Sequence, residues 1–562
     1  MKKLFRHWIP AYAGMTKINA GMTIKIAGMT IALSFSFYLM FHTFSFDKRT
    51  QSITIASKAW SDFGAHIPLI HSFSKGANFN RLSLAQPIES PLFPNEPIRY
   101  HFGFYSIVGL LERLGMRLDY AVNIPSALGF FLMLIMIFVF SYALFSSTFV
   151  SILSVLFTIF NGSLSFIRFF TDHPISLNTP IDIITNSKFT SFGPWDGGLI
   201  SAFWTLNIFT NQRHLALAYG LSLLIIFMTL KKSKNIYIAL IISILLYIHF
   251  PAALMATIFL AWIFLVEKNT RSTLFYSALW SLPTLFFLSH KVLIGSPIVV
   301  DYGYLIQGPL TIFSFLKYWF YNIGFHSIFI PLGILFSPRS IRRLIAFPLL
   351  LLFIIPNVYR LSPDMINNHK FFNFFMIIGS MFSAYAVVWF WKFFRKQISL
   401  IRPIGLISLI GITFFLVFSG IIDLFPIIND SRGSVVNSDK RQDILFFENH
   451  TNPNDVIANS TWFYHPASLA GRAIYSGYTY FTWSYGYNQG KREQELLSIY
   501  QAPNLSTLCS LLSTLTISYV ELSKTPEEYI HPNLSLWNSI PAEYTNPDTF
   551  LRVYSKNTLC QN

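Results

Sequence analysis

A carboxylate, two histidines and an arginine lie in two short segments soon after the first apolar run of the chain. Asp62 and His66 stand in the first segment, and Arg99, Tyr100 and His101 stand in the second. Only 12% of the residues are charged, and polar groups near hydrocarbon are costly, so this cluster predicts a functional site. A carboxylate there can act as a general base toward an attacking hydroxyl group. A helix cap or an ion pair with Arg99 would explain Asp62 equally well.

His66 lies four residues after Asp62, so the two side chains would share one face of a helix. We take Asp62 and His66 as the candidate catalytic residues because such a pair can share a proton. The pair can also bind a divalent metal ion, although a simple hydrogen bond fits the spacing too. The sequence therefore admits a divalent metal as a cofactor without requiring one.

Cationic side chains that suit phosphate oxygens recur in the polar segments. The guanidinium group offers a planar fork of donors that matches phosphate. Each cation alone also fits a lipid headgroup or an ion pair, the histidines also fit structural roles, and Asp364 also fits a salt bridge with Lys370. Together these side chains predict an anionic ligand. The candidate substrate-binding residues are Arg99, Tyr100, His101, Arg213, His214, Asp364, Lys370 and Arg472.

A chain built for a membrane must position these residues. It has 562 residues, of which 53% are hydrophobic, and its mean hydropathy is +0.48. Runs of about 20 apolar residues can span a bilayer, and helices satisfy their own backbone polar groups there, so we expect an α-helical polytopic membrane protein. The runs do not alternate as the strands of a β-barrel would. About 11 transmembrane helices are expected, at residues 31–46, 124–145, 149–170, 215–230, 236–249, 252–266, 274–291, 312–336, 344–359, 371–394 and 404–424.

The basic residues predict how these helices are oriented. Clusters of lysine and arginine follow the fourth, sixth, eighth and tenth expected spans, so all lie on one side, which the positive-inside rule makes the cytoplasm. The N-terminus is then cytoplasmic, and an odd number of spans places the C-terminus outside. This bias and attraction to membrane lipids explain the net charge of +16. We expect no nucleic-acid binding, because no basic stripe with interleaved aromatic residues stands apart from the spans.

The chain divides into three parts. Residues 1–30 repeat the tetrapeptide Ala-Gly-Met-Thr and are interpreted as a leader or a repeat-derived segment. Residues 31–425 form the transmembrane domain, with a long first outer loop at 47–123. Residues 426–562 lack long apolar runs and predict a small extracytoplasmic α/β domain. A helix is expected in this domain at 443–449, and strands are expected at 455–458, 516–522 and 550–554.

The composition of the last part and the absence of common motifs narrow the function. Cys509 and Cys560 are allowed, but not required, to form a disulfide outside the cytoplasm. Aromatic and cationic residues between positions 471 and 493 suit sugar stacking and phosphate binding. The sequence contains no Walker loop, dinucleotide fingerprint, serine nucleophile elbow or zinc-protease motif. An ATP-driven pump and an enzyme that uses cytosolic nucleotides are therefore disfavoured.

With these features the chain resembles the GT-C superfamily of glycosyltransferases, which includes protein O-mannosyltransferases, oligosaccharyltransferases and lipid A aminoarabinose transferases. The resemblance rests on the acid soon after the first span, the long first outer loop, the many helices and the outer C-terminal domain, over about residues 30–560. Bacterial membrane proteins that resemble this chain more closely share the motifs at Asp62–Ile70, Pro97–Phe102, Asn211–Leu215 and Asn368–Phe374.

The resemblance implies a polyprenyl-phosphate sugar as donor, an inverting displacement, and an outer-face acceptor that is a glycan, a lipid or a protein. It implies that Asp62 is the general base and that the protein lies in the bacterial inner membrane. Many members carry a second acid directly after the first, whereas Phe63 stands there in this chain. The role of that second acid is left open, and His66 is the neighbour that could take it.

Two other functions stay open. A transporter or flippase for lipid-linked or anionic solutes predicts charges within the spans and an internal repeat. The sequence shows few charges within the spans and no clear repeat of its halves. A non-catalytic envelope assembly protein would bind a partner through its outer domain. The glycosyltransferase interpretation predicts that Asp62, Arg99, Arg213 and Lys370 converge on one outer cavity.

Overall fold

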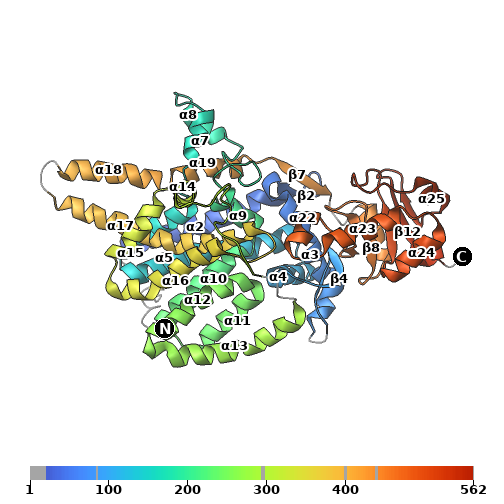
Figure 1. Cartoon of the computed structure of the whole chain (residues 1–562), viewed down its shortest axis with the longest axis horizontal. Coiled ribbons are helices and arrows are strands. Elements are labelled where there is room, and N and C mark those ends of the chain that lie inside the picture. The colour runs from blue at the N-terminus through green and yellow to red at the C-terminus, as the bar shows by residue number, and fades with distance from the viewer. Residues whose placement is uncertain (1–19, 84–85, 293–297, 398–400, 437–440, 561–562) are drawn as a thin grey trace.

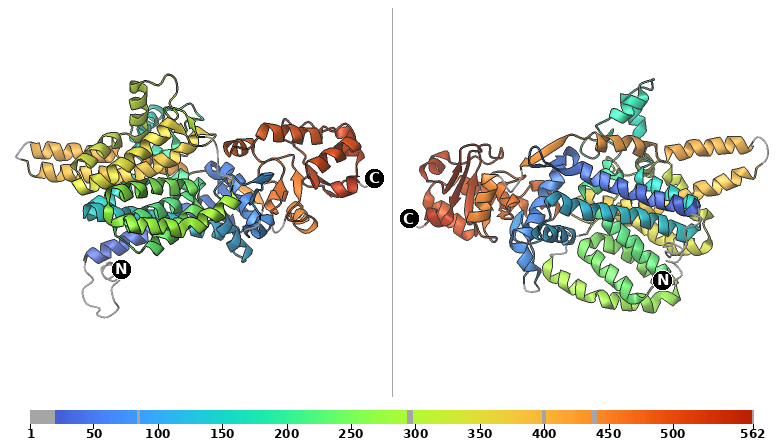
Figure 2. Two further views of the ribbon diagram at one scale, coloured as in Figure 1. Left: turned by 60° about the horizontal axis from the view of Figure 1, so that its bottom comes forward. Right: turned by 180° about the vertical axis from the view of Figure 1, so that it is seen from behind.

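The computed structural model describes residues 20–83, 86–292, 298–397, 401–436 and 441–560. The first copy of the Ala-Gly-Met-Thr repeat, at 13–16, lies outside these residues, and the two later copies fall within helix α2 (Ala20–Thr43). Long helices run side by side in one body, and a smaller part with a sheet lies beyond one end of it (Figure 1). The segment that follows α2 lies between the two parts (Figure 2).

Among the described residues, five segments are long and apolar enough to cross a membrane, or up to seven if each bent helix pair is one span. They make the chain a polytopic helical membrane protein, as predicted, but several expected spans are short or bent, and the expected count of 11 is not reached. The five are α2, α5 (Leu118–Phe145), α16 (Arg339–Val358), α17 (His369–Arg395) and the pair α18 (Ile401–Phe415) and α19 (Phe418–Ile428).

The other apolar helices are bent or short. The pair α12 (Phe250–Val266) and α13 (Arg271–Lys291) bends by 118°, and the pair α14 (Ile312–Ile323) and α15 (His326–Phe336) bends by 88°. The shorter apolar helices of the body are α6 (Thr148–Ile159), α10 (Leu215–Leu230) and α11 (Asn235–Ile248).

Two spans expected to be continuous are broken, and the breaks contact each other. The span expected at 312–336 breaks at Gly324, which has a φ of +53°. The span expected at 149–170 divides into α6 and α7 (Ser165–Asp172) around Gly162. A Cβ atom at Gly324 would lie 1.9 Å from the carbonyl oxygen of Gly162. This close backbone approach requires glycine and interrupts both helices.

A three-stranded sheet joins the end of α2 to the chain that follows the last membrane helix. Strand β1 (Phe44–Asp47) pairs with β2 (Ser52–Ala56), and β2 pairs with β7 (Arg432–Val436), both in antiparallel orientation. An ion pair of 2.8 Å between Lys58 Nζ and Asp430 Oδ1 continues the contact beyond the strands. The first helix of the outer loop, α3 (Trp60–Ser74), therefore starts from a fixed point.

Helix α3 is buried almost throughout and packs against α4 (Gly103–Arg113). The small hairpin of β3 (Glu89–Ser90) and β4 (Phe93–Pro97) lies between these two helices in the sequence. Short elements connect the larger ones: η1 (Ser57–Ala59), η2 (Ala77–Leu82), α8 (Thr179–Thr185), η3 (Ala202–Trp204), α9 (Asn207–Asn211), η4 (Lys268–Thr270), β5 (Val299–Val300), β6 (Tyr359–Arg360) and η5 (Met365–Asn368).

The C-terminal part holds a sheet of order β11-β12-β10-β8-β9, in which β8 pairs in parallel with β9 and β10. Three of its strands and the first helix lie where the sequence predicts them. A disulfide of 2.01 Å joins Cys509 to Cys560. The strands are β8 (Val456–Ala458), β9 (Ala473–Ile474), β10 (Tyr519–Leu522), β11 (Tyr544–Asn546) and β12 (Leu551–Ser555), and the helices are α20 (Gln442–His450), α21 (Pro466–Leu469), α22 (Thr479–Ser484), α23 (Gln489–Tyr500), α24 (Leu505–Thr514), α25 (Leu534–Ser539) and α26 (Lys556–Cys560).

The start of α10, the end of α11 and the start of α17 meet at one end of the helical body. The rings of His214 and His249 lie 5.1 Å apart, and Gln212 lies 3.5 Å from His369. The opposite ends of α10 and α17 carry two of the basic clusters, since the helices extend away from this meeting point. The polar loops and the basic clusters therefore lie at opposite ends.

The contact between α4 and α11 can be tested by Gly103→Ala. A Cβ atom at this position would lie 2.1 Å from the carbonyl oxygen of Tyr247, and backbone cannot yield as a side chain can. We expect the variant to lose about 1–3 kcal/mol of unfolding free energy, the usual effect of overpacking, measured as a lower Tm in detergent. Gly411→Ala is the control, because nothing lies within 4 Å of its added Cβ. Equal Tm values for the two variants would contradict the packing described.

Candidate functional site

The candidate site is centred on Asp62, in the first turn of α3. The chain just before this turn is held from two sides. The backbone N–H of Lys58 donates to Asp430 Oδ2 at 2.9 Å, and the Asn211 amide donates to the Lys58 carbonyl at 2.9 Å. Segments far apart in the sequence therefore fix where the carboxylate lies.

Asp62 is partly exposed, yet enough protein surrounds it that burial raises the pKa of its carboxyl group to about 6. The Lys370 ammonium and a hydrogen bond from the Asn211 side chain act in the opposite direction on this pKa, with a smaller effect. The N-terminal end of a helix also favours an anion. At neutral pH the group is therefore mostly ionised and able to accept a proton, as a general base must.

Lys370 stands in the first turn of α17, is 7% exposed and interacts electrostatically with both Asp62 and Asp364. Asp364 accepts the Tyr480 hydroxyl at 2.5 Å and the backbone N–H of Ile366 at 3.0 Å. These bonds hold Asp364 as a structural acid. Asp62 is the better placed of the two carboxylates to react, with a buried cation beside it.

Five tyrosines interact electrostatically with Asp62, and Tyr105 of α4 is one of them. Tyr100 comes from the first outer loop, and Tyr464, Tyr480 and Tyr485 come from the C-terminal part. Burial, and then the neighbouring groups, raise the pKa values of Tyr100 and Tyr485 well above the usual value. The hydroxyl groups are therefore neutral at physiological pH and can donate hydrogen bonds.

The C-terminal part covers α3 directly. The Tyr464 hydroxyl donates to the Trp60 carbonyl at 2.6 Å, and a Cβ atom added at Gly64 would lie 2.3 Å from the ring of Phe463. The rings of Tyr100 and Tyr485 lie 4.7 Å apart. Asp62 thus lies where the first outer loop, the start of α17 and the C-terminal part meet.

His66 is 3% exposed and is not suited to donate a proton. Burial, followed by the charges of Arg213 and Lys370, lowers its pKa to about 3. Its ring lies 4.7 Å from Tyr105 and 6.5 Å from His214. The neutral ring does not donate a proton at physiological pH, so we do not assign it the role of the second acid.

Arg213 is brought near the site but is occupied by protein oxygens. It is 1% exposed, and its guanidinium group donates to the carbonyl oxygen of Met40 at 3.3 Å and to Thr43 Oγ1 at 2.8 Å. These atoms belong to the last turn of α2, whose negative end a cation stabilises. Arg213 therefore ties α2 to the start of α10.

Arg99 and Arg472 do not join this cluster. The Arg99 guanidinium donates to the Gly486 carbonyl and lies 4.8 Å from the centre of the Tyr487 ring. Arg472 is 4% exposed and donates to Thr451, as well as to backbone carbonyls, within the C-terminal part. Four residues were expected to converge. The charges of Asp62 and Lys370 act on each other. Arg213 instead binds the last turn of α2, and Arg99 binds the C-terminal part.

The residues around Asp62 do not fit a divalent metal ion. Such ions prefer several oxygen ligands, but the charged group that acts on Asp62 is the ammonium of Lys370. Phe63, at the position where a second acid was expected, is fully buried and stacks on Phe44 at 4.4 Å. The proposed role of Asp62 therefore involves no metal ion.

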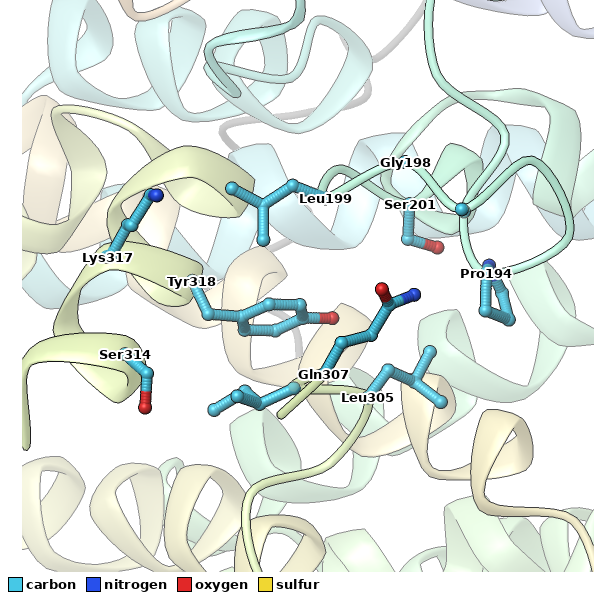
Figure 3. A pocket seen from close by; sticks show the side chains of 12 residues that line it. Pro194, Gly198, Leu199, Ser201, Leu305, Gln307, Ser314, Lys317 and Tyr318 are labelled. Carbon is cyan, nitrogen blue, oxygen red and sulfur yellow. The ribbon is translucent and has the colours of Figure 1, made fainter. Parts of the chain in front are cut away.

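A pocket of about 190 Å³ lies between residues 193–201 and the start of α14. Figure 3 shows the Tyr318 hydroxyl and the Gln307 amide pointing into it. Its lining includes the cation Lys317 but no carboxylate and no histidine. It offers no general base, so we place the candidate site at Asp62. A much smaller hollow of about 20 Å³ adjoins that site, lined in part by His66, Tyr100 and Tyr485.

Sequence reasoning included Asn211 in a motif without giving it a role, and it did not single out Tyr105, Tyr464, Tyr480 or Tyr485. The concentration of aromatic residues between positions 471 and 493 was a usable signal for the last two. The others carry no pattern of their own, because their role depends on contacts between distant segments.

The raised pKa of Asp62 predicts a pH-dependent effect of Asp62→Asn on stability. The carboxyl group binds its proton more tightly in the folded state, with a pKa of about 6, than at its ordinary value of 3.8. Wild type should therefore lose stability relative to the variant as the pH rises from 4 to about 6. Thermal unfolding in detergent at pH 4 and pH 7 measures the difference. A variant that instead loses stability relative to wild type as the pH rises would show that the ionised carboxylate is stabilising.

Solved structures with a similar arrangement are those of the Archaeoglobus fulgidus oligosaccharyltransferase AglB, an enzyme of the GT-C superfamily. Its complex with an inhibitory peptide and a dolichol-phosphate has 12% sequence identity and a TM-score of 0.42, covering 88% of this chain and 69% of that chain. Its complex with Zn and sulfate has 12% identity and a TM-score of 0.45, covering 88% and 67%.

No family model matches the chain, and no curated protein matches it in sequence. With identities and TM-scores this low, the structural likeness assigns neither an activity nor a residue role to this chain.

Proposed function

We propose that this protein is an integral membrane glycosyltransferase that moves a sugar from a polyprenyl-phosphate donor to an acceptor hydroxyl group outside the cytoplasm. The observation that carries the proposal is the position of Asp62, which is partly exposed in the first turn of α3, where the charge of the buried Lys370 acts on its carboxyl group. A base and a buried cation are the two groups that such a transfer needs.

The proposed reaction is a single displacement. The acceptor oxygen forms a bond to the anomeric carbon of the sugar while the bond from that carbon to the phosphate oxygen breaks. Asp62 takes the proton of the acceptor hydroxyl group, and the bonding pair leaves with the polyprenyl phosphate. Lys370 stabilises the negative charge that develops on the departing phosphate. One displacement inverts the configuration at the anomeric carbon.

The tyrosines suit the binding of a sugar. Tyr100 and Tyr485 offer ring faces and neutral hydroxyl groups beside Asp62. Rings of this kind stack on sugars and can hydrogen-bond to their hydroxyl groups. The C-terminal part, which contributes Tyr464, Tyr480 and Tyr485, would help to select the acceptor.

Two observations support an outer location for this chemistry. The basic clusters after α10 and α17 lie at the opposite end from Asp62, and the positive-inside rule assigns them to the cytoplasm. The disulfide between Cys509 and Cys560 is typical of an oxidising compartment. A bacterial inner membrane with this site on its outer face satisfies both.

Asp62→Asn tests the base directly. Loss of general-base catalysis should lower transfer by about 100-fold or more, measured with purified protein and lipid-linked sugar donors. Asp548→Asn, at an exposed acid of the C-terminal part, should transfer at the wild-type rate. Unchanged transfer by Asp62→Asn would remove the base assignment. Movement of the lipid-linked donor across vesicles, with no transfer by wild type, would favour a flippase instead.

Lys370→Met tests the electrostatic partner through the pH profile. Activity should fall as the pH drops below about 6, where Asp62 becomes protonated. The ammonium group lowers the pKa of Asp62, so its removal should move this acidic limb of kcat/KM to higher pH, by roughly one unit. An acidic limb that stays in place or moves down would show that Lys370 does not act on the base.

A further inference from the structure

Three histidines from separate segments meet beside the candidate site. His101 lies two residues before α4, His214 directly precedes α10, and His249 lies between α11 and α12. One ring nitrogen from each lies within 4.8 Å of the others. Their ring centres are 4.2 to 5.1 Å apart. The three rings therefore point a nitrogen toward one common space.

The nitrogens that share this space lack partners. The Nε2 atoms of all three histidines are buried and form no hydrogen bond within the described residues. His214 and His249 are 0% exposed, so bulk water does not reach those side chains. Buried polar atoms are nearly always paired, so three unpaired nitrogens on adjoining rings indicate a shared ligand.

We propose that His101, His214 and His249 bind one divalent transition-metal ion, with zinc as the preferred metal. Neutral imidazole is a good ligand for zinc, and three protein ligands with one open position form a common zinc site. Magnesium and calcium prefer oxygen ligands, and none of the three ligands supplies an oxygen. This inference does not rest on the proposed glycosyl transfer.

The geometry requires a small closing movement. Zinc–nitrogen bonds are about 2.0–2.1 Å long, so ligand nitrogens around zinc lie closer together than the 4.8 Å limit that holds here. His101 is partly exposed and stands just before a helix, so it has the most room to move. The ion would enter from its side.

The surroundings orient two of the rings. The Tyr105 hydroxyl lies 2.9 Å from His214 Nδ1, which leaves Nε2 facing the space. A bond of this kind to the second ring nitrogen is usual for metal-binding histidines. His249 Nδ1 instead accepts the backbone N–H of Ala252 at 3.0 Å and caps α12, so its Nε2 carries the hydrogen.

For His249 to bind a metal through Nε2, its Nδ1 must therefore lose the hydrogen bond from Ala252, and the ring hydrogen must move from Nε2 to Nδ1. A helix cap contributes far less free energy than a zinc ion held by several side chains, so the exchange is favourable. The cap also supplies an informative variant. Asparagine is among the best N-cap residues but a poor zinc ligand, so His249→Asn keeps the helix start and removes the metal ligand.

The test uses the full chain in detergent without a polyhistidine tag, stripped with a chelator and titrated with zinc chloride. We expect one zinc ion per chain by atomic emission, a higher Tm in its presence, and visible absorption bands when cobalt replaces zinc. His101→Ala and His249→Asn should weaken zinc binding by about 100-fold or more, and Tyr105→Phe by about 10–100-fold. His290→Asn, at an exposed histidine of α13, is the matched control and should bind zinc as wild type does.

Binding by His249→Asn that equals wild type, or no zinc retained by wild type beyond that of the variants, would overturn the proposal. The three nitrogens would then be satisfied by an ordered water molecule. The Tm of each variant without zinc shows whether it folds. A His101→Ala chain that fails to fold leaves His249→Asn and Tyr105→Phe to decide.

Discussion

Antiparallel pairing of β2 with β7 places Ser52 opposite Val436 and Ala56 opposite Arg432. The ion pair of Lys58 with Asp430 continues that contact toward α3. Together with the hydrogen bond from Asn211 to the Lys58 carbonyl, this contact fixes where the first turn of α3 starts, and so where Asp62 lies. The same pairing brings the C-terminal part back over the first outer loop, so one contact orders both the carboxylate and the tyrosines that cover it.

Two of the charged residues near the candidate site, Arg213 and Asp364, stabilise the fold through hydrogen bonds. Arg213 donates to the Met40 carbonyl in the last turn of α2, and Asp364 caps η5 and accepts a hydrogen bond from Tyr480. Asp62 and Lys370 are different, because burial opposes the ionised carboxylate and raises its pKa to about 6. A carboxyl group whose pKa is raised by burial in this way is a candidate for chemistry rather than for stabilising the fold.

Much of the helical fold could be predicted from the sequence, because long apolar runs have few alternatives in a membrane. The strands at β8, β10 and β12 were also predictable from their local patterns. Breaks such as those at Gly162 and Gly324 were not, because a contact between two helices produces them. Among the described residues, the expected count of 11 spans is not reached for this reason and because several apolar helices are short.

At the site, residue type was a good guide to the acid and a poor guide to the cations. The charge of Lys370 acts on Asp62, but the guanidinium groups of Arg99 and Arg472 donate hydrogen bonds to backbone carbonyls. A guanidinium group suits such oxygens as well as it suits phosphate, so type alone could not separate the roles. The three histidines before α4, α10 and α12 are more than a hundred residues apart at their extremes, and only the packing of those helices brings them together.

A structure of the Asp62→Asn variant with a polyprenyl-phosphate sugar bound would test the central claim most directly. The donor should be trapped because its transfer is blocked. We predict that its phosphate contacts Lys370 and that the anomeric carbon of its sugar faces position 62 beneath Tyr100 and Tyr485. A donor bound away from Lys370, for example in the pocket at Tyr318, would contradict the assignment of the site.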